Sequence, residues 1–504
     1  MISGHATPEG TTAFSRQHAP VAFSNLGETG LIISQAGFGG YRVAAGIKQH
    51  ETALRHALDG GINLIDTSSN YTDGASETLI GQVLEDMIAS GRISRQQVIV
   101  VSKVGYLQGQ NLELSQQRKR EGRPFQELVE PMQGLEHCIH PEFIADQLTR
   151  SLERLKLRTL DGYLLHNPEY YLGLAHKQGV KPETARKEYY RRIHQAFHHL
   201  ENEVKNGRIR FYGISSNTFP SKTDDPEFTC LAEVWKIAES ISPDHHFRLI
   251  QLPFNLLETG AALARNQPGG QTVLEFARKT KLGVLINRPL NAFTGNQMLR
   301  LADINEPRRM DDKTVIQSIR AVGLSETRLW LRILPQLDIP SGIQVRIKEQ
   351  LAIGDTLKHY WKNFVSYERW RMVKNTNFHP RIQGVMDFLK PHAGDSPDLS
   401  SWIADHSACL ENAYQAVGSI YADQAAREIK RLRAAVSKAA PEWSDAESIS
   451  RMAIRAVRST SGVSTVLVGM RREAYVNEVL DELRFSVERA ERREIWERLR
   501  DHFA

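Results

Sequence analysis

Residues 63–77 read NLIDTSSNYTDGASE and join the end of an apolar run to a polar, turn-forming segment. The letters NLID are typical of a buried strand that ends in an acid, here Asp66, and a lone tyrosine, Tyr71, follows in the turn. One acid at the end of a strand is common and indicates no function by itself. The interpretation of this stretch therefore depends on whether other strands of the chain end in the same way.

Short apolar, β-branched runs recur along the chain and alternate with longer segments of helical periodicity. The runs are continuously apolar, which is typical of strands buried on both faces of a parallel sheet. They predict eight strands: Leu31–Gly37, Asn63–Thr67, Val98–Lys103, Gly162–His166, Arg210–Ser215, Leu249–Phe254, Gly283–Arg288 and Val463–Gly469. Strands in alternation with helices predict an α/β fold, the (β/α)8 or TIM barrel. A doubly wound sheet is the alternative, but GFGGYR at residues 37–42 lacks the G-x-G-x-x-G spacing expected there.

The predicted strands are unevenly spaced. All but the last lie before residue 289, and the last begins near residue 463, so residues 294–443 are expected to form an insertion after the seventh strand. The insertion has helical periodicity and holds five of the seven tryptophans, which predicts a mostly α-helical subdomain. The barrel would then comprise residues 21–293 and 444–504, and the polar residues 1–20 would form a flexible N-terminal tail.

Composition and charge narrow the range of partners. The chain has 504 residues, of which 41% are hydrophobic and 24% charged, and its net charge of +5 is too mild to favour nucleic-acid binding. No apolar run approaches the roughly 20 residues that a membrane span needs, and the polar N-terminus predicts no signal peptide. Three scattered cysteines argue against a disulfide framework. We therefore expect a soluble, cytoplasmic protein that acts on a small molecule.

Ionisable side chains end three consecutive predicted strands. Asp66 ends the second strand, Lys103 the third and His166 the fourth. Tyr71 lies in the loop that follows Asp66. In a barrel of parallel strands the loops at the carboxyl ends build the active site, so these four side chains are expected to meet. The acid and the tyrosine of residues 63–77 therefore belong to one set.

The chemistry of this set suits proton transfer to a carbonyl oxygen. A free tyrosine has a pKa of about 10, and a neighbouring lysine ammonium would lower it. Asp66 would hold Lys103 charged and oriented, while His166 could share a hydrogen bond with a substrate oxygen. A proton donor of this kind needs a separate source of hydride, which predicts a nicotinamide cofactor. A purely structural ion-pair network at the rim of the barrel is the alternative.

Blocks of the sequence resemble the aldo-keto reductase family. They occur in family order: FSNLGETGLIISQAGFGG (23–40), GGINLIDTSSNYTDGASETLIG (60–81), VVSKVG (100–105), LDGYLLHNPE (160–169), GRIRFYGISSN (207–217), IQLPFNLLE (250–258) and STSGVSTVLVGMRREAYVNEVL (459–480). The resemblance implies the barrel and the NAD(P)H-dependent reduction of an aldehyde or ketone, or oxidation of the corresponding alcohol. It also implies that Tyr71 is the general acid of a tetrad with Asp66, Lys103 and His166. A nicotinamide-binding regulatory or sensor protein with little turnover is the alternative function.

The resemblance also implies a cofactor site. Its residues would be Gly40, Tyr41, Ser215, Ser216, Asn217, Gln251, Arg288, Leu290, Gly469, Arg471, Arg472 and Glu478. Ser215 and Gln251 would bind the nicotinamide carboxamide, since hydroxyl and amide groups suit an amide ligand. Arg471 and Arg472 lie where the adenosine phosphate would bind, which favours NADP(H), with NAD(H) as the alternative.

The chain departs from the family pattern after the seventh predicted strand. Asn287-Arg288-Pro289-Leu290 stand where the family usually has Tyr-Ser-Pro-Leu, so the ring that stacks on the nicotinamide is absent. Arg288 would compensate by pairing with the pyrophosphate of the cofactor. The histidines of HCIH (137–140) have no second cluster of ligands at a useful spacing, so no metal site is predicted.

Overall fold

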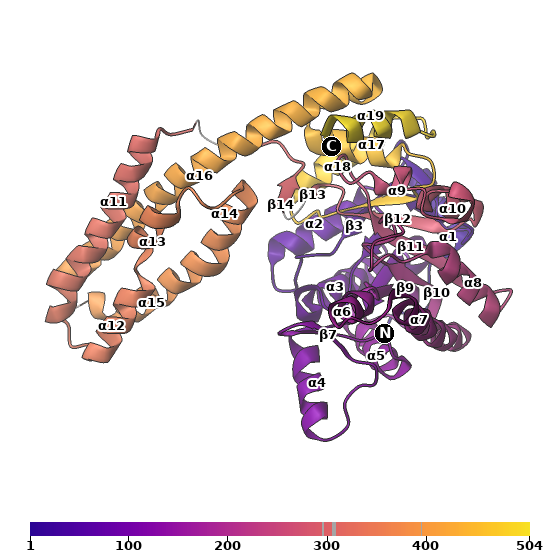
Figure 1. Ribbon diagram of the computed structural model, residues 1–504, viewed down its shortest axis with the longest axis horizontal. Coiled ribbons are helices and arrows are strands. Elements are labelled where there is room, and N and C mark those ends of the chain that lie inside the picture. Colours follow the sequence, from indigo (N-terminus) through magenta and orange to yellow (C-terminus); the bar gives the residue numbers. More distant parts are fainter. Residues whose placement is uncertain (295–296, 305–308, 395, 504) are drawn as a thin grey trace. The chain divides into compact units, whose positions relative to one another are not determined.

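The computed structural model describes residues 1–294, 297–304, 309–394 and 396–503. The chain divides into two compact units, one made of Met1–Ala292 with Val436–Ala504 and the other of Phe293–Ala435 (Figure 1). Residues 436–443, which the sequence pattern assigns to the insertion, therefore belong to the unit that holds the barrel. Among the described residues, each unit has buried apolar clusters of its own.

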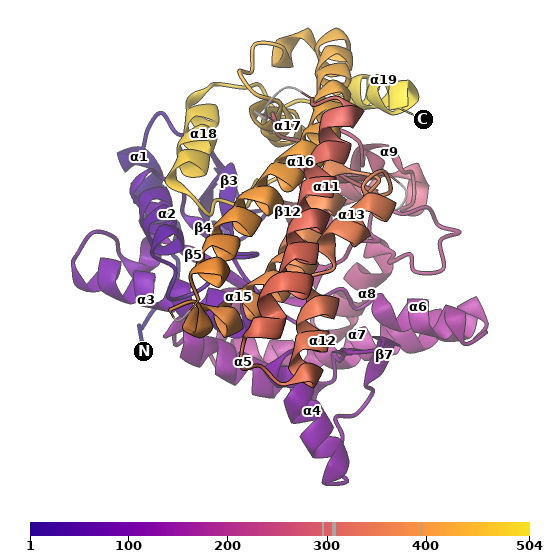
Figure 2. The same cartoon turned by 90° about the vertical axis from the view of Figure 1, so that its left-hand side faces the viewer.

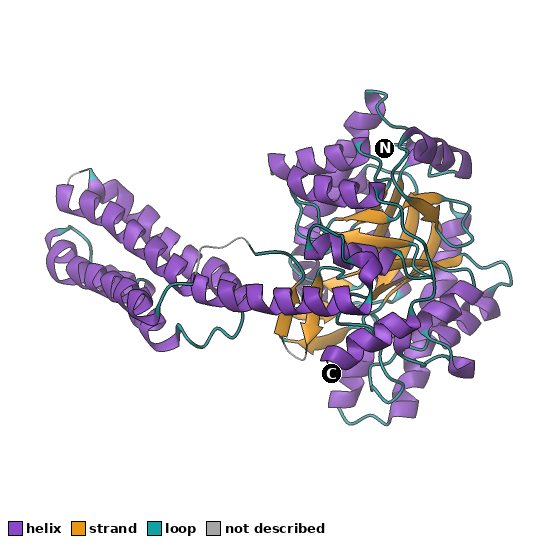
Figure 3. Ribbon diagram, turned by 90° about the horizontal axis from the view of Figure 1, so that it is seen from above, coloured by secondary structure: helices purple, strands orange, loops and turns teal. Residues whose placement is uncertain are grey.

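Parallel strands form a closed barrel in the first unit (Figure 3). Around the barrel they follow the order β3 (Ala36–Gly39), β4 (Leu64–Asp66), β5 (Ile99–Val104), β9 (Leu160–His166), β10 (Ile209–Ser215), β11 (Phe247–Pro253), β12 (Gly283–Asn287) and β15 (Thr465–Val468). The last strand pairs with the first, with Val466 opposite Ala36, and this pairing closes the barrel. The predicted (β/α)8 fold is confirmed.

The first barrel strand begins later than predicted. The apolar run Leu31–Gly37 covers the end of a hairpin and only the start of β3. In this hairpin β2 (Ile32–Ser34) pairs antiparallel with β1 (Phe23–Asn25). Ile33 is buried in the same cluster as side chains of the barrel interior, such as Leu64. The run therefore joins the apolar residues Leu31, Ile32 and Ile33 to the start of β3 through Ser34 and Gln35, and it is not one strand.

Helices alternate with the strands of the barrel. They are α2 (Lys48–Asp59), α3 (Ala75–Ala89), α5 (Pro141–Leu155), α6 (Tyr170–Lys177), α7 (Pro182–Lys205), α8 (Leu231–Ile241), α9 (Gly260–Leu263), α10 (Val273–Lys279), α17 (Ile449–Arg458), α18 (Glu473–Arg484) and α19 (Arg493–Phe503). α5 illustrates the pattern: it begins at Pro141 and buries Ile144, Leu148 and Leu152 on one face. That spacing of three to four residues places an apolar stripe against the strands.

The N-terminal segment is folded, so the prediction of a flexible tail is wrong. α1 (Pro8–Gln17) begins after Thr7, whose hydroxyl accepts a hydrogen bond from the Gly10 N–H. The Ala6 N–H donates to Asp161 at 2.8 Å, and Phe14 is buried. A polar segment such as residues 1–20 can be ordered because a small number of buried side chains, together with several hydrogen bonds to the barrel, hold it in place.

A small antiparallel sheet interrupts the connection between β5 and α5, and the sequence pattern did not predict it. It contains β6 (Tyr106–Leu107), β8 (Leu135–His137) and β7 (Val129–Met132) in that spatial order. α4 (Gln110–Arg120) lies between β6 and β7 in the chain. Because this segment follows the carboxyl end of β5, it brings further side chains to the end of the barrel where Lys103 lies.

The second unit is mostly helical. It contains the helices α11 (Asp312–Arg328), α12 (Ser341–Gln350), α13 (Ile353–Tyr360), α14 (Tyr367–Val373), α15 (His379–Ala393) and most of α16 (Pro397–Ala439). The short strands β13 (Asn291–Thr294) and β14 (Gln297–Arg300) precede them. α11 and α16 lie side by side (Figure 2), and their buried faces share a cluster with Trp370. Trp402 belongs to a second cluster of the same unit, so these tryptophans are core residues.

Candidate active site

The four ionisable side chains at the strand ends lie together. Lys103 donates hydrogen bonds from Nζ to Asp66 Oδ2 at 2.8 Å, to the Thr67 carbonyl at 2.8 Å and to the Tyr71 hydroxyl at 3.2 Å. Lys103 is fully buried and Asp66 almost so, whereas Tyr71 is half-buried. The His166 ring lies 6.0 Å from the Tyr71 ring, centre to centre, and nearly perpendicular to it.

The register of the barrel explains this meeting. β4, β5 and β9 are neighbours in the sheet, with Asp66 opposite Val101 and Lys103 opposite Leu164. Parallel strands end at the same edge of a sheet, so Asp66, Lys103 and His166 all reach the carboxyl end of the barrel. Tyr71 joins them because it begins the short turn η1 (Tyr71–Gly74), which only residues 67–70 separate from β4.

A second layer of hydrogen bonds holds Asp66 from the other side. Gln251 on β11 donates from Nε2 to Asp66 Oδ1 at 2.8 Å, and its Oε1 accepts a hydrogen bond from the Ser215 hydroxyl at 3.0 Å. Ser215 and Gln251 lie opposite each other on paired strands. Ser215 and Gln251, which the resemblance assigns to the cofactor site, therefore share one hydrogen-bond network with the Asp66–Lys103 pair.

Burial controls the protonation of the pair and of the phenol. Burial raises the pKa of Tyr71 above its ordinary value, although the Lys103 ammonium opposes this change. The sequence interpretation expected a lowered pKa, and it is wrong because it left desolvation out. Burial lowers the pKa of Lys103, but Asp66 and Tyr71 outweigh it and raise that pKa. Burial likewise raises the pKa of Asp66 against the effect of Lys103. Lys103 is thus charged and Tyr71 protonated at neutral pH.

His166 is neutral in this environment. Burial, followed by the nearby Lys103 ammonium, lowers the pKa of His166 well below its ordinary value. The Ser68 hydroxyl lies 3.2 Å from His166 Nδ1 and fixes the orientation of the ring. A neutral imidazole has one donor and one acceptor nitrogen, so the ring can share a hydrogen bond with a neighbouring oxygen.

Aromatic and polar side chains that the sequence analysis missed surround His166. The Tyr106 ring lies 4.7 Å from the His166 ring, and the Tyr106 hydroxyl accepts a hydrogen bond from Asn167 and donates one to Tyr170. His137 donates from Nε2 to the His166 carbonyl at 2.7 Å. The only signal in the sequence was the segment HCIH. Its role depends on the small antiparallel sheet, which pairs His137 with Tyr106.

The first predicted cofactor residues flank Tyr71. The Gly40 N–H donates to the Asp66 carbonyl at 2.7 Å, and a Cβ at Gly40 would lie 2.8 Å from both that carbonyl and the Ser76 hydroxyl. Only glycine therefore fits at this position. Tyr41 is 59% exposed, and its ring lies 5.2 Å from the Tyr71 ring. Tyr41 thus presents an open aromatic surface next to the tetrad.

Ser216 and Asn217 have different surroundings although they are adjacent. Ser216 is fully buried, and its hydroxyl lies 3.1 Å from Thr218 Oγ1 in a cluster that includes Thr229. Asn217 is exposed, and its N–H donates to Glu169 Oε1 at 2.8 Å. Burial raises the pKa of Glu169 to about 7. Asn217 can therefore reach a bound ligand, whereas Ser216 serves the packing beneath it.

Arg288 has a protein partner in this structure. Its Nη2 lies 2.9 Å from Glu258 Oε1, and burial lowers the pKa of Arg288 against the effect of Glu258. The expected pairing of Arg288 with a pyrophosphate therefore has to compete with Glu258. Leu290 is half-buried in the same segment. Asn287 Oδ1 is buried and has no hydrogen-bond partner within the part of the chain that the structure describes.

The loop after β15 carries the remaining predicted cofactor residues. Gly469 opens the loop, and a Cβ there would meet nothing within 4 Å. Arg471 follows, and Arg472 is the residue that precedes α18. Glu478 accepts hydrogen bonds at 2.5 Å from two serine hydroxyls at the start of α17. Glu478 is therefore half-buried and held by these hydrogen bonds, while the loop between Gly469 and α18 carries the arginines.

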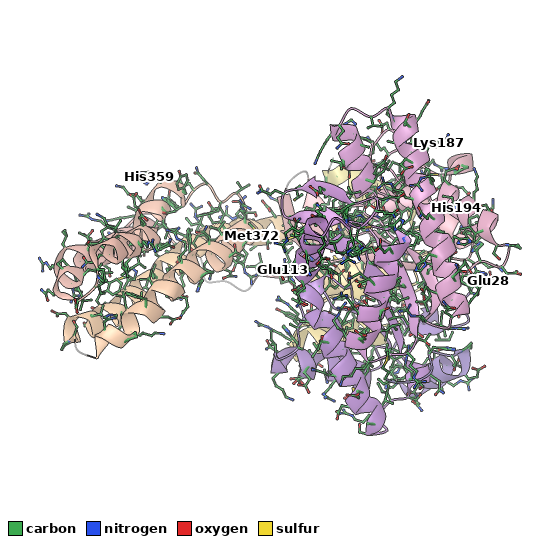
Figure 4. The ribbon with its side chains drawn as sticks, turned by 90° about the horizontal axis from the view of Figure 1, so that it is seen from below. Glu28, Glu113, Lys187, His194, His359 and Met372 are labelled. Atoms are coloured by element: carbon green, nitrogen blue, oxygen red, sulfur yellow. The ribbon has the colours of Figure 1, made fainter. Side chains whose placement is uncertain are left out.

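Two further kinds of site are absent from the described residues. No group of three or more His, Cys, Asp or Glu side chains among them is arranged to hold a metal ion. On α7, His194 (labelled in Figure 4) and His198 are exposed, and neither belongs to such a group. Within the same residues, no helix has the length and apolar character needed to cross a membrane.

Comparisons with known proteins match the barrel. Residues 37–242 match the model of the aldo/keto reductase family. The NADH-specific methylglyoxal reductase of Escherichia coli (strain K12) is 28% identical over 149 residues, which cover 28% of this chain and 40% of that protein. The 6-dehydroglucose reductase of Novosphingobium aromaticivorans is 26% identical over 208 residues, which cover 40% of this chain and 53% of that protein. The chain thus spans about half, or less, of the length of these curated relatives.

A solved structure is also similar. It is an aldo/keto reductase from Klebsiella pneumoniae in complex with NADP and acetate, with 20% sequence identity and a TM-score of 0.32. The match covers 52% of this chain and 67% of that one.

Proposed function

We propose, from the premise that residues 37–242 match the model of the aldo/keto reductase family, that the protein is an oxidoreductase that reduces an aldehyde or ketone, or oxidises the corresponding alcohol, with a nicotinamide cofactor. One observation carries the proposal: a fully buried Lys103 ammonium bonds both the Asp66 carboxylate and the Tyr71 hydroxyl. A buried ion pair adds little to the free energy of folding. Its presence here is therefore better explained by its effect on Tyr71, whose hydroxyl it places where the phenol can exchange a proton.

Tyr71 supplies the proton in the proposed reaction. Its raised pKa keeps the phenol protonated at neutral pH until the carbonyl oxygen of the substrate gains negative charge. The O–H bond of Tyr71 then breaks as the new O–H bond of the alcohol forms, and Lys103 stabilises the phenolate that remains. Asp66 keeps Lys103 charged and oriented. His166, which Ser68 holds in place, shares a hydrogen bond with the same substrate oxygen.

The residues around the tetrad fit a nicotinamide nucleotide. The buried Asn287 Oδ1 needs a donor, and a carboxamide N–H would be one. Ser215 and Gln251 add hydroxyl and amide groups beside Asp66, and Arg471 and Arg472 offer guanidinium groups that suit phosphate oxygens. When bound, the cofactor supplies the hydride that the carbonyl carbon receives. The two arginines favour NADP(H) over NAD(H) in this proposal.

The proposal includes a cytoplasmic site of action. All three cysteines are free thiols in the structure. Free thiols of this kind suit a reducing compartment, in which disulfides are rare.

A turnover assay tests the proposed function. Purified protein is mixed with NADPH or NADH and a panel of aldehydes and ketones, and consumption of the reduced cofactor is followed. We expect saturable consumption with at least one carbonyl, and none with the Tyr71→Phe variant. Cofactor binding without turnover of any panel member would instead favour a nicotinamide-binding regulatory protein.

A further inference from the structure

The loop that carries Tyr71 continues in an unusual backbone conformation. Thr72 has a φ of 47° and Asp73 a φ of 55°, and Gly74 follows with a φ of 86°. Glycine adopts the left-handed region at no steric cost and aspartate tolerates it, but a residue branched at Cβ such as threonine is a genuine outlier there. Two residues with left-handed backbone, of which Thr72 carries the greater strain, therefore follow the proposed proton donor directly.

Each strained residue uses its side chain as an anchor. The Thr72 hydroxyl donates a hydrogen bond to the Val43 carbonyl at 2.6 Å, which ties the turn to the segment after Tyr41. The Asp73 carboxylate accepts the Gln110 N–H at the first turn of α4, at 3.1 and 3.4 Å from its two oxygens. The residue before α4 is Gly109, which has no side chain to cap the helix, so Asp73 caps it from another loop.

The neighbouring segment is shaped to accept the second anchor. Gly109 has a φ of 52°, and a Cβ there would lie 2.4 Å from Asp73 Oδ1. Any larger residue would displace the carboxylate. Asn70, on the other side of Tyr71, adds a hydrogen bond of 3.2 Å to Gln108. The loop of Tyr71 is thus joined to residues 108–110 on both sides of the phenol.

The two anchors lie next to Tyr71, whose position in the site is defined by its contacts. The Tyr71 hydroxyl meets Lys103 at 3.2 Å, and its ring stands between the Tyr41 ring at 5.2 Å and the His166 ring at 6.0 Å. Glycine at position 72 or 73 would remove the strain. Strained residues persist where the surrounding structure over-determines them, and they cluster at sites where the strain serves the mechanism.

We propose that Thr72 and Asp73 are positioning residues, which use a strained turn and two side-chain anchors to hold the Tyr71 hydroxyl beside Lys103. The proposal rests on the proposed function of Tyr71 as proton donor and extends it to two residues that act through Tyr71. The two anchors hold the turn in its strained conformation. Removing either side chain therefore relaxes the turn and at the same time frees the Tyr71 hydroxyl to move.

The experiment compares releasing and conservative variants in the full chain. Thr72→Gly and Asp73→Gly remove both strain and anchor, whereas Thr72→Ser keeps the hydroxyl and Asp73→Asn keeps a helix-capping oxygen. Lys156→Gly is the matched control, because Lys156 is also left-handed, with a φ of 57°, but lies at the end of α5. Each variant is assayed with NADPH and 4-nitrobenzaldehyde, and its Tm is measured.

We expect Thr72→Gly and Asp73→Gly to lose kcat by roughly tenfold to hundredfold, while KM for the aldehyde changes by about twofold or less. Thr72→Gly should keep its Tm or gain about 2 °C, because a strained residue has been relieved. Thr72→Ser and Asp73→Asn should retain most of kcat, and Lys156→Gly all of it. A kcat of parent size in both glycine variants would overturn the proposal, as would a loss of kcat that only follows a loss of Tm.

A second readout separates this proposal from the proposed function. Fluorine NMR of protein labelled with 3-fluorotyrosine reports the surroundings of Tyr71, whose resonance is assigned by its loss in Tyr71→Phe. Thr72→Gly should shift or broaden that resonance, and Lys156→Gly should not. If the parent protein reduces no carbonyl, the proposed function fails, and the resonance alone decides: an unmoved signal in Thr72→Gly overturns the positioning role.

Discussion

At the scale of single residues, the site depends on the buried Lys103 ammonium, which bonds Asp66, the Thr67 carbonyl and Tyr71. Lys103 would be poorly tolerated without Asp66, because an unpaired ammonium in the interior is strongly destabilising. In the proposed mechanism, the hydrogen bond of Lys103 to Tyr71 selects the phenol as the proton donor. Tyr71 is therefore the proposed proton donor, and Lys103 and Asp66 orient its hydroxyl.

Replacing Tyr71 by Phe should abolish turnover and leave cofactor binding almost intact, because it removes one hydroxyl and its proton. Turnover is followed by cofactor oxidation, and binding by titration of the reduced cofactor. Tyr163→Phe is a suitable control: the Tyr163 hydroxyl is buried without a hydrogen-bond partner among the described residues, on the same strand as His166. Undiminished carbonyl reduction by Tyr71→Phe would disprove the mechanism.

At the scale of elements, the loop after β15 carries the arginines proposed to bind the cofactor, and two helices carry acids that bond to a neighbouring helix. The loop between β15 and α18 carries Arg471 and Arg472, and Glu478 follows on α18, where Ser450 of α17 bonds it. In the second unit, Glu326 on α11 accepts hydrogen bonds from the first N–H groups of α13. In each case an acid on one helix accepts hydrogen bonds from another helix, and the loop after β15 and Glu326 each lead to a measurable prediction.

The loop after β15 should select NADP(H). The 2′-phosphate carries close to two negative charges, and guanidinium groups can bind it with paired hydrogen bonds. Hydrogen bonds to charged groups contribute about 1.5–3 kcal/mol, so we expect a preference of roughly tenfold to hundredfold. The dissociation constants of NADPH and NADH are compared in the parent, in Arg471→Ala/Arg472→Ala and in the control Arg484→Ala at the far end of α18. A preference that survives the double substitution would exclude these arginines as its source.

Glu326 should make the stability of the second unit depend on pH. Burial raises the pKa of Glu326 to about 7, well above the value of about 4.3 in an unfolded chain. Folding therefore favours the protonated acid, and its stabilising effect, complete below about pH 4, is lost as the pH rises through about 7. The loss amounts to about 4 kcal/mol at most.

Glu326→Gln should reduce this pH dependence, because an uncharged amide oxygen can still accept the N–H groups of Ile353 and Gly354. The measurement is the unfolding midpoint of the full chain at several pH values, followed by tryptophan fluorescence. Glu411→Gln, at an exposed position on α16, is the control. Parallel pH profiles of parent and Glu326→Gln would show that this carboxyl does not titrate on unfolding.

At the scale of the whole molecule, two units share one chain, and among the described residues each has buried apolar clusters of its own. The residues of the candidate site all belong to the unit of Met1–Ala292 and Val436–Ala504. The core of the second unit is built around its own tryptophans, including Trp370 and Trp402. A chain of this kind is not expected to unfold in a single two-state transition.

We therefore expect two thermal transitions, of which NADPH raises only the one that belongs to the barrel. A ligand at a hundred times its dissociation constant stabilises its unit by about 2.7 kcal/mol. Calorimetry with and without NADPH gives the two midpoints, and the Arg471→Ala/Arg472→Ala variant should show a smaller shift. One transition that moves as a whole with NADPH would show that the units unfold together.

The amino-acid sequence by itself determined the barrel and the identity of the four residues at its rim. Apolar runs are local patterns, and parallel strands share an edge, so Asp66, Lys103 and His166 could be placed together without coordinates. The same reasoning could not separate the hairpin strand β2 from β3, because both are apolar and the pattern carries no information on where the chain turns. It also missed α1, whose few buried contacts leave no periodic signal.

Only the tertiary structure decided the protonation of Tyr71 and the surroundings of His166. Desolvation is set by every group that excludes water, most of them distant in the sequence, and here it outweighs the effect of Lys103 on the phenol. His137 and Tyr106 reach His166 through a small sheet that has no strong pattern of its own. The strain at Thr72 is a backbone angle, which a threonine in the sequence cannot reveal. Residue types and their order are local, whereas burial and strain belong to the folded whole.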